Sequence, residues 1–482
     1  MSNAPRATAP EDRIPFPKML IYGIGAFVNN LLGAASGGMM IVLNLGFGMN
    51  PALVGLLGAL PRLTDAFTDP VMGYISDNTQ TRWGRRRPFI FVGAILTAVM
   101  FVVLWALPEG KSDTWYFAYF LGVSIVFYLA YTMFATPWVA LGYELTPDYN
   151  ERTRLMGTQN FVGQLAFTVS PWFLSIMNSG RFFVDENGEA DQIAGAFGLA
   201  VVIAIVTIAL GTLPAIFLRE RMADLAESEK REKASFADSM KHFFKGFGIT
   251  VKSRPFQKLA ITALLVFNGF MLVASFQFYV IIYYVFGGDE ARGADWAGIA
   301  GTTGAVANFG IVALMAWLGT RIGKRKALMW GIGLSMFGFA IKWFCYQPEV
   351  PWLVVVPMPF ISFGLASLFT IVPSMIADVV DCDELETHER REGAFGSIFW
   401  WMVKLGLSGA LALSGIMLNM TGFDVDLGPD QTARTLLMMR LFDIFVPLLA
   451  SGIALWAVFR FEITEEVARD VRAKLEARRG KT

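Results

Sequence analysis

Long apolar runs alternate with short polar connections along almost the whole chain. Each run is long enough to cross the hydrocarbon core of a bilayer as an α-helix, and a charged, apolar-poor stretch at 219–255 divides the runs into two sets of six. The pattern predicts an all-α membrane protein with twelve transmembrane helices in two six-helix halves. The predicted spans are about 19–45, 52–75, 88–107, 116–141, 157–178, 194–218, 256–285, 296–319, 326–346, 351–377, 394–418 and 435–460.

The segments outside the spans complete the predicted domain plan. We expect a disordered N-terminal tail at 1–18, which has no apolar core after a basic start and is therefore not a signal peptide. The two halves cover 19–218 and 256–460, and the 219–255 linker joins them. The tail at 461–482 interleaves acidic and basic residues, which is typical of a short solvated helix.

Lysine and arginine gather in one set of connections between the spans. Cytoplasmic loops of membrane proteins carry this excess, and an even number of spans puts both chain ends on one side. We therefore expect both termini, the linker and the basic loops to be cytoplasmic. The basic set holds Arg82, Arg85, Arg86, Arg87, Arg152, Arg154, Arg321, Lys324, Arg325 and Lys326, and the opposite set holds Lys111, Arg181, Arg292 and Arg434.

The two halves resemble each other. A basic loop, 83–87, joins the second and third spans, and a similar loop, 322–326, joins the eighth and ninth. The fourth and tenth spans each contain a proline that an acid follows within eight residues, Glu144 in one case and Asp378 in the other. This internal repeat is typical of secondary transporters whose halves rock about a site near the membrane midplane.

Composition supports a membrane protein and argues against an enzyme. The chain is 55% hydrophobic and 17% charged, with a mean hydropathy of +0.50, whereas soluble domains carry about 25% charged residues. Cys345 and Cys382 fall on opposite sides of the membrane, so we expect no disulfide. His242 and His388 stand alone, without a metal-ligand cluster, nucleophile elbow or phosphate loop. We expect no catalysis, no cofactor and no nucleic-acid partner.

Three ionisable residues lie inside the second apolar run. Arg62, Asp65 and Asp69 share one face of a continuous helix, because they are three and four residues apart. A charge at that depth costs about 2.5–3.5 kcal/mol and is usually functional. The acids could bind Na⁺ through oxygen ligands or share an exchangeable proton. The alternative is a structural salt bridge with a spare acid.

Other charges also fall within apolar runs. Lys404 lies about ten residues into its span, and we expect it to face a polar cavity or pair with Asp65 or Asp69 rather than reach the membrane surface. Arg440 and Asp443 are three residues apart, so we expect them to form a structural pair.

The segment Gly73–Pro88, with the preceding acids and Pro70, resembles the helix 2–3 signature of the major facilitator superfamily. Its long form is similar to that of the glycoside–pentoside–hexuronide:cation symporters, the family that melibiose permease typifies. The stretch Asp378–Glu384, followed by Arg390–Gly393 and Lys404, matches the same family. Residues 84–90 also resemble sucrose/proton symporters.

This resemblance implies a cation site at Asp65, Asp69 and Thr132, with Arg62 and Lys404 as charged residues of the same cavity. Thr68 stands where the family has an asparagine ligand, which thins the oxygen shell. We therefore expect H⁺ as the coupling ion and keep Na⁺ as the alternative.

The implied sugar site differs from that of the family. Asn30, Ala135 and Asn160 replace two carboxylates and a guanidinium, but amides still hydrogen-bond to hydroxyls in both directions. We expect a neutral sugar or glycoside, such as the α-glucosides sucrose or maltose. Any one of the candidate residues could instead serve helix packing. The candidates are Asn29, Asn30, Tyr131, Trp138, Asn160, Gln164 and Trp401.

Charged residues at the cytoplasmic helix ends could form a gate whose ion pairs break and re-form between states. We expect Asp77 to pair with the 85–87 arginines, and the acids of the tenth span to pair with Arg390 or Arg152. The alternative is that the arginines only set topology. The predicted gate comprises Asp77, Arg85, Arg86, Arg152, Asp378, Asp381, Glu384 and Arg390.

Together these features predict a cation-coupled importer of a sugar in a bacterial-type inner membrane, with the bilayer as its surroundings and a monomer as its functional unit. Transport of a lysolipid or another amphipathic solute is the alternative, because lysolipid carriers share the pattern of the second span. The linker, at 219–255, is too short for a signalling domain.

Overall fold

The computed structural model describes residues 13–146, 149–179, 191–220, 250–388 and 392–478, together with Phe183 and Gly248. Within these residues all regular structure is helical. The chain divides into two compact units, which are considered separately below.

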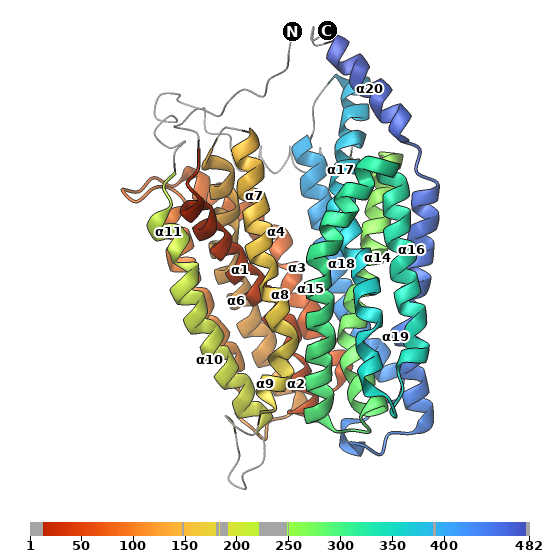
Figure 1. The fold of residues 1–482 in the computed structure, drawn as a ribbon. Helices are drawn as coiled ribbons and strands as arrows, with labels where there is room; N and C mark the ends of the chain where they lie inside the picture. The colour runs from red at the N-terminus through yellow and green to blue at the C-terminus, as the bar shows by residue number, and fades with distance from the viewer. Residues whose placement is uncertain are drawn as a thin grey trace. The chain divides into compact units, whose positions relative to one another are not determined.

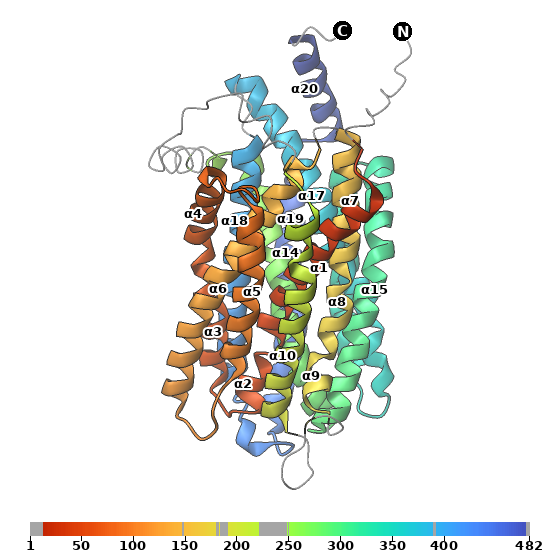
Figure 2. The same cartoon turned by 90° about the vertical axis from the view of Figure 1, so that its left-hand side faces the viewer.

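The first unit comprises Met1–Met49 and Leu60–Lys233. Its helices run up and down in one bundle, with α10 beside α5 and α1 in Figure 2. The helices are α1 (Phe16–Gly38), α2 (Ile41–Leu45), α4 (Asp65–Asn78), α5 (Arg87–Trp105), α6 (Asp113–Glu144), α7 (Tyr149–Gln164), α8 (Ala166–Val169), η2 (Ser170–Trp172), α9 (Phe173–Met177), α10 (Gln192–Gly211) and α11 (Leu213–Phe217).

The second unit comprises Asn50–Ala59 and Ala234–Thr482. It is a second helical bundle, drawn in green to blue in Figure 1. Its helices are α14 (Arg254–Tyr279), η3 (Val280–Val285), α15 (Glu290–Ile322), α16 (Lys324–Cys345), η4 (Pro351–Val355), α17 (Pro357–Thr387), α18 (Glu392–Met420), η5 (Val425–Leu427), α19 (Ala433–Phe459) and α20 (Glu465–Arg478).

Helix α3 (Pro51–Leu63) straddles this division, since its first residues group with the second unit. There Gly55 lies against the backbone of α18, and a Cβ on Gly55 would stand 2.7 Å from the carbonyl oxygen of Leu411. Only glycine fits such an approach. The predicted halves, 19–218 and 256–460, therefore differ from the observed units at this segment.

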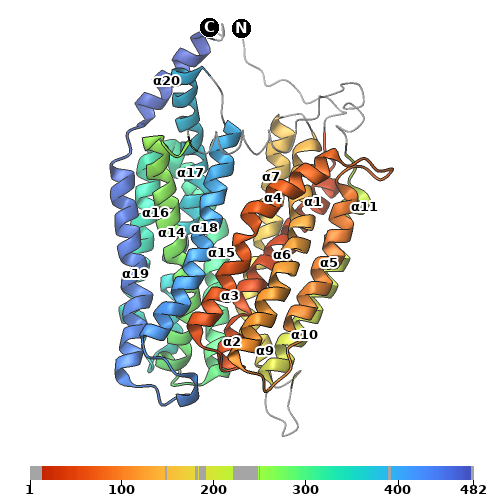
Figure 3. The ribbon, with the colours of Figure 1, turned by 180° about the vertical axis from the view of Figure 1, so that it is seen from behind.

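Among the described residues, ten helices are long and apolar enough to span a membrane. The two further predicted spans, 52–75 and 157–178, are occupied by broken helices. In the first, α3 ends at Leu63 and α4 begins at Asp65, end to end in Figure 3. The interruption is local: Asp65 and Asp69 lie one turn apart on α4, and Thr64 keeps helical backbone angles, with φ −66° and ψ −30°.

Local chemistry explains this break. The Thr64 amide donates to the carbonyl oxygen of Pro61 at 3.1 Å, a tighter turn than that of an α-helix, and the Thr64 hydroxyl donates to the same oxygen at 2.5 Å. Pro70, inside α4, brings no amide hydrogen for the carbonyl of Ala66. The predicted fifth span is broken as well, at Leu165 and again in η2, where Pro171 lies in a 3₁₀ turn.

Each unit has an aromatic and aliphatic core. In the first, α5 packs against α6, with Phe101, Phe127 and Phe134 buried between helices. Gly93 lets the two backbones meet, since a Cβ there would lie 2.5 Å from the Phe134 nitrogen. The second core includes Phe256 of α14, Val372 of α17 and other buried residues of four or more helices. Such packing fixes the helix faces that carry polar groups.

Candidate functional site

A carboxylate and three hydroxyls meet inside the first unit, between α4 and α6. The hydroxyls of Thr132 and Thr136 donate to Asp69 Oδ1 at 3.1 and 3.2 Å. The Thr68 hydroxyl lies 3.3 Å from that of Thr132. Thr132 is buried and Asp69 is half-buried. The four side chains present hard oxygen ligands, which suit a small cation or an exchangeable proton.

Arg62, at the end of α3, reaches across to α1 and α6. Its guanidinium donates to the carbonyl oxygen of Gly33 at 3.3 Å and to the Ser36 hydroxyl at 3.1 Å, and it lies 5.6 Å from the centre of the Tyr128 ring. The Tyr128 hydroxyl also donates to Ser36. The contacts described for Arg62 are thus with neutral groups, and its predicted role as a partner of the acids stays a prediction.

Four predicted site residues have no described contact with these groups. Asp65 begins α4, but its side chain lies outside the described part of the structure, as does the whole of Arg390. Lys404 and Trp401 lie on α18 of the second unit. The predicted pairing of Lys404 with the acids and the predicted place of Trp401 in the sugar pocket remain predictions.

Polar residues on α1, α6 and α7 form a second cluster in the same unit. The Tyr131 hydroxyl donates to Asn29 Oδ1 at 2.8 Å, and Asn29 donates to Asn30 Oδ1 at 3.4 Å. Asn30 in turn donates to the carbonyl oxygen of Gly163 at 3.0 Å. These three side chains are half-buried. They are joined by hydrogen bonds and combine amide and hydroxyl groups, which can both donate to and accept from the hydroxyls of a sugar.

Three other predicted sugar ligands have different surroundings. Trp138 is 1% exposed, stacks on Tyr22 and donates to the Tyr22 carbonyl oxygen at 3.3 Å, so in this conformation it packs α6 against α1. Asn160 and Gln164 lie one turn apart on α7, where Asn160 is exposed and Gln164 half-buried. We leave Trp138 out of the proposed pocket.

The predicted gate residues of the first unit form an ion-pair network. Arg86 contacts Asp77 at 2.7 Å and Glu144 at 2.9 Å, and Arg85 also pairs with Glu144. The carboxylate of Glu220 accepts the backbone amides of residues 85, 86 and 87, at 3.0, 2.7 and 3.2 Å. Glu220 thereby caps α5, which satisfies amides that a helix start leaves without partners.

Gly84 makes room for this cap. Its φ is +107°, and a Cβ would lie 2.7 Å from Glu220 Oε1. Arg152, a further predicted gate residue, donates instead to the carbonyl oxygens of Tyr143 and Thr146, at 3.4 and 3.2 Å. It therefore fixes the end of α6.

The gate acids of the second unit have partners other than the predicted arginines. Lys324 contacts both oxygens of Asp378 at 2.7 Å, because α16 packs against α17 and brings its first residue to that carboxylate. Glu384 pairs with Arg478 of α20 at 3.5 Å. Asp381 is half-buried on α17. In the described residues Asp378 is thus held by Lys324 and Glu384 by Arg478. The predicted pairing with Arg390 or Arg152 stays a prediction, since Arg390 lies outside the described residues.

A buried ion pair replaces the predicted pair of Arg440 and Asp443. Lys342 of α16 contacts Asp443 of α19 at 3.0 Å, with both side chains fully buried, and the Tyr346 hydroxyl donates to Asp443 at 2.7 Å. Arg440 instead lies 4.1 and 4.4 Å from the ring centres of Tyr284 and Trp343. The spacing of three residues permits a contact but does not choose among neighbours on other helices.

Sequence reasoning missed Thr136, Glu220 and Lys342. Thr136 follows Thr132 by four residues and so shares its helix face, which was a usable signal. Lys342, like Lys404, lies inside a predicted apolar span, and this costly position was a usable signal as well. The capping role of Glu220 carried no sequence signal, because it depends on how α11 returns to α5.

Comparison with known proteins identifies the family. A family model described as MFS/sugar transport protein matches residues 21–465. The chain is 27% identical to an uncharacterised symporter of Synechocystis sp., over 97% of this chain and 98% of that protein. It is 23% identical to the isoprimeverose transporter of Lactiplantibacillus pentosus, over 96% and 93%. It is also 24% identical to the sodium-dependent lysophosphatidylcholine symporter 1 of Gallus gallus, over 98% and 91%.

Solved structures support the fold. A bacterial homologue of the human lysosomal transporter Spinster, in an inward-facing and unoccupied conformation, aligns with a TM-score of 0.66 at 13% identity, over 94% of this chain and 98% of that chain. At this identity the match shows the fold alone. These proteins are membrane transporters of the predicted superfamily and not enzymes.

Proposed function

Because the chain belongs to the MFS/sugar transport protein family, we propose that it is a cation-coupled symporter that imports a neutral sugar or glycoside by alternating access. The observation that carries this proposal is the Asp69 carboxylate, held between α4 and α6 by the hydroxyls of Thr132 and Thr136. Relatives named as symporters and as an isoprimeverose transporter support the same class.

The proposed coupling works through charge. A cation or proton at Asp69, with Asp65 as the second acid, neutralises the cavity and lets Arg62 and Lys404 change partners. The neutral contacts of Arg62 with Gly33 and Ser36 fit a guanidinium that can be drawn to the acids when they are empty. Because linkage is reciprocal, bound sugar must tighten cation binding by the same factor.

We propose H⁺ as the coupling ion. A proton needs one carboxylate, whereas Na⁺ needs several placed oxygens. Thr68 replaces the amide ligand expected from the family resemblance, which favours the proton. The additional hydroxyl of Thr136 enriches the oxygen set, so Na⁺ is the alternative that the experiment must test.

The proposed sugar pocket is formed by Asn29, Asn30 and Tyr131, whose mutual hydrogen bonds could be exchanged for bonds to sugar hydroxyls. Asn160, Gln164 and Trp401 are proposed to complete it. We propose an α-glucoside such as sucrose or maltose as substrate.

We also propose a setting for this transporter: a bacterial-type inner membrane, both termini in the cytoplasm, and a monomer as the functional unit. The excess of lysine and arginine in one set of loops supports that orientation. In this orientation the Asp77–Arg86 and Asp378–Lys324 pairs lie at the cytoplasmic ends of their helices and serve as a gate.

Reconstitution into liposomes tests the proposal. Uptake of radiolabelled sucrose and of maltose is measured under an imposed pH gradient and, separately, under a Na⁺ gradient. We expect accumulation above the external concentration under the pH gradient. Asp69→Asn should abolish accumulation and leave sugar exchange between the two sides intact, because the coupling site is lost while the pocket remains.

Asp426→Asn is the matched control, since this carboxylate is exposed and lies in a turn of the second unit. It should accumulate sugar as the wild type does. Full accumulation by Asp69→Asn at normal incorporation contradicts the coupling role. Accumulation driven by Na⁺ alone contradicts the proton.

Import of a lysolipid is the second candidate, and the similarity to the lysophosphatidylcholine symporter over 98% of this chain favours it. The same liposomes can be assayed with a fluorescent lysophosphatidylcholine. Uptake of this lipid without uptake of any sugar would replace the sugar proposal.

A further inference from the structure

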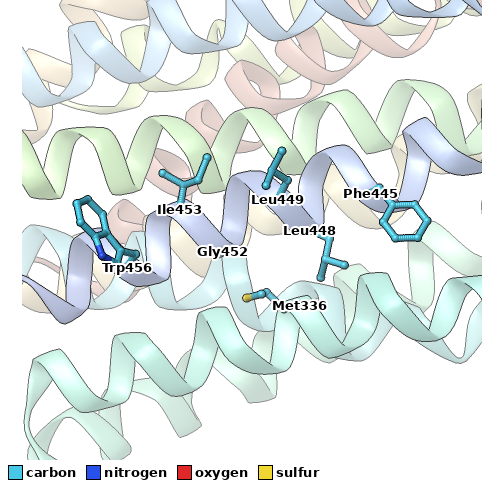
Figure 4. A pocket seen from close by; sticks show the side chains of 7 residues that line it. All are labelled: Met336, Phe445, Leu448, Leu449, Gly452, Ile453 and Trp456. Carbon is cyan, nitrogen blue, oxygen red and sulfur yellow. The ribbon is translucent and has the colours of Figure 1, made fainter.

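An apolar groove runs along the outer face of the second unit, between α16 and α19. It has a volume of about 560 Å³, and Figure 4 shows Met336 of α16 opposite a row of α19 side chains. Phe445, Leu449 and Trp456 of this row are 51, 68 and 61% exposed. The groove is therefore open to the hydrocarbon of the membrane along its length.

The groove has the dimensions of one acyl chain in one leaflet. From Phe445 to Trp456 it extends over twelve residues of α19, which is about 16 Å at the rise of an α-helix. Half of the hydrocarbon core of a bilayer is about 15 Å. Gly452 lies midway in the row, and a Cβ there would approach only the methyl carbon of Met336, at 3.7 Å. The missing side chain leaves the centre of the groove open.

Positive charge marks one end of the groove. Arg460 lies one turn beyond Trp456, is exposed, and holds its guanidinium 5.9 Å from the centre of the Trp456 ring. Arg325, at the start of α16, lies over the Phe459 ring at 5.7 Å and donates to the Phe459 carbonyl oxygen.

The nearby acid does not cancel this charge. Glu462 is engaged by Lys258 at 2.7 Å, and Lys258 also donates to the carbonyl oxygen of Arg460. In the described part of the chain, Arg460 forms no ion pair with a carboxylate. Its guanidinium is therefore available to an anion outside the protein.

We propose that this groove binds an anionic phospholipid, with one acyl chain along α19 and the phosphate at Arg460 and Arg325. Arginine binds phosphate through paired hydrogen bonds, and basic sites beside membrane helices select anionic headgroups. Trp456 lies where the apolar groove meets the charges, the position that tryptophan favours at a membrane interface. The lipid belongs to the leaflet on the side of the C-terminal tail.

Native mass spectrometry of the detergent-purified full chain tests this proposal. The protein is titrated with phosphatidylglycerol and with phosphatidylcholine of identical acyl chains. We expect wild type to retain phosphatidylglycerol in preference, and Arg460→Gln to weaken that binding about fivefold, the contribution of one basic residue near a lipid surface. Arg460→Lys should recover most of it. Gly452→Leu, which fills the groove, should reduce binding of both lipids.

Arg292→Gln is the matched control, because its side chain is 69% exposed at the start of α15, at the opposite end of that helix from the start of α16. It should bind as wild type does, and a thermal melt of each variant shows that it is folded. Equal retention of the two lipids by wild type would overturn the proposal. So would unchanged phosphatidylglycerol binding in Arg460→Gln, or a dimer that Gly452→Leu dissociates, since the groove would then hold a second copy.

Discussion

At the scale of single residues, two hydroxyls of α6 hold the carboxylate of Asp69 on α4. Asp69 accepts from Thr132 and Thr136, and both bonds end on the same oxygen. Hydroxyls can turn their hydrogens toward the charged acid or their lone pairs toward a bound cation. These hydroxyls can therefore serve the site both when a cation is bound and when it is absent.

Removing one hydroxyl tests this reading of the site. For H⁺ we expect Thr132→Val or Thr136→Val to lower the proton concentration for half-maximal uptake about tenfold, since each removes a hydrogen bond that favours the charged carboxylate and contributes about 1.5–3 kcal/mol. A Na⁺ site would lose an oxygen ligand instead, and the Na⁺ concentration for half-maximal uptake should then rise. The measurement is uptake into liposomes at varied pH and Na⁺. Thr207→Val is the control, because this buried hydroxyl has no hydrogen-bond partner in the described structure. If the cation concentration for half-maximal uptake is the same in all three variants, Thr132 and Thr136 are not part of the cation site.

At the scale of elements, the sequence predicted which segments are helical better than where helices break. Asp69 and Thr132 were both selected from the chain, one as an intramembrane charge and the other through the family resemblance, and the structure brings their side chains into contact. The interruption at Thr64 was not predicted. It depends on the carbonyl oxygen of Pro61 accepting hydrogen bonds from both the amide and the hydroxyl of Thr64. Thr136 was overlooked although its spacing from Thr132 was visible.

Contacts between helices were harder still to predict. The sequence suggested that Asp443 would pair with Arg440 on its own helix, but Lys342 of α16 holds it. Helical spacing shows which residues can meet within one helix and says nothing about the facing helix. The order of spans along the chain could not supply that information either, since it does not fix the rotation of α16 and α19 against each other.

The buried pair of Lys342 and Asp443 should stabilise the packing of α16 on α19. We expect Lys342→Met to lower the free energy of unfolding by about 3–5 kcal/mol, because an unpaired carboxylate then stays buried. Adding Asp443→Leu should recover most of the loss. Unfolding in detergent is followed by the protection of Cys345, which is buried on the same helix.

Lys258→Met is the control for this pair. Its partner Glu462 is 60% exposed at the side chain, so the change should stay within about 1 kcal/mol. If the double variant is no more stable than Lys342→Met, the penalty lies in lost packing and not in the uncompensated charge.

At the scale of the whole molecule, the two units repeat one arrangement. In each, the basic loop before the third helix of the unit binds an acid that follows a proline: Arg85 and Arg86 bind Glu144, and Lys324 binds Asp378. In each, a glycine with positive φ shortly precedes the helix that follows the loop and lies beside a glutamate from beyond the unit's sixth predicted span. These are Gly84 with Glu220, and Gly323 with Glu465. The repeat that the sequence indicated thus extends to the contacts themselves.

Charge reversal in the second unit tests whether this repeated pair acts in transport. Lys324→Asp places two carboxylates together, so we expect the initial rate of uptake to fall several-fold. Adding Asp378→Lys restores opposite charges and should restore the rate. Because the pair is partly exposed, with side chains 37 and 20% accessible, stability should change by less than about 1 kcal/mol. Lys326→Asp, an exposed neighbour on the same helix, should transport normally. A double variant as slow as Lys324→Asp would mean that the lysine acts through position and not through its pairing, and the gate would then rest on the first unit alone.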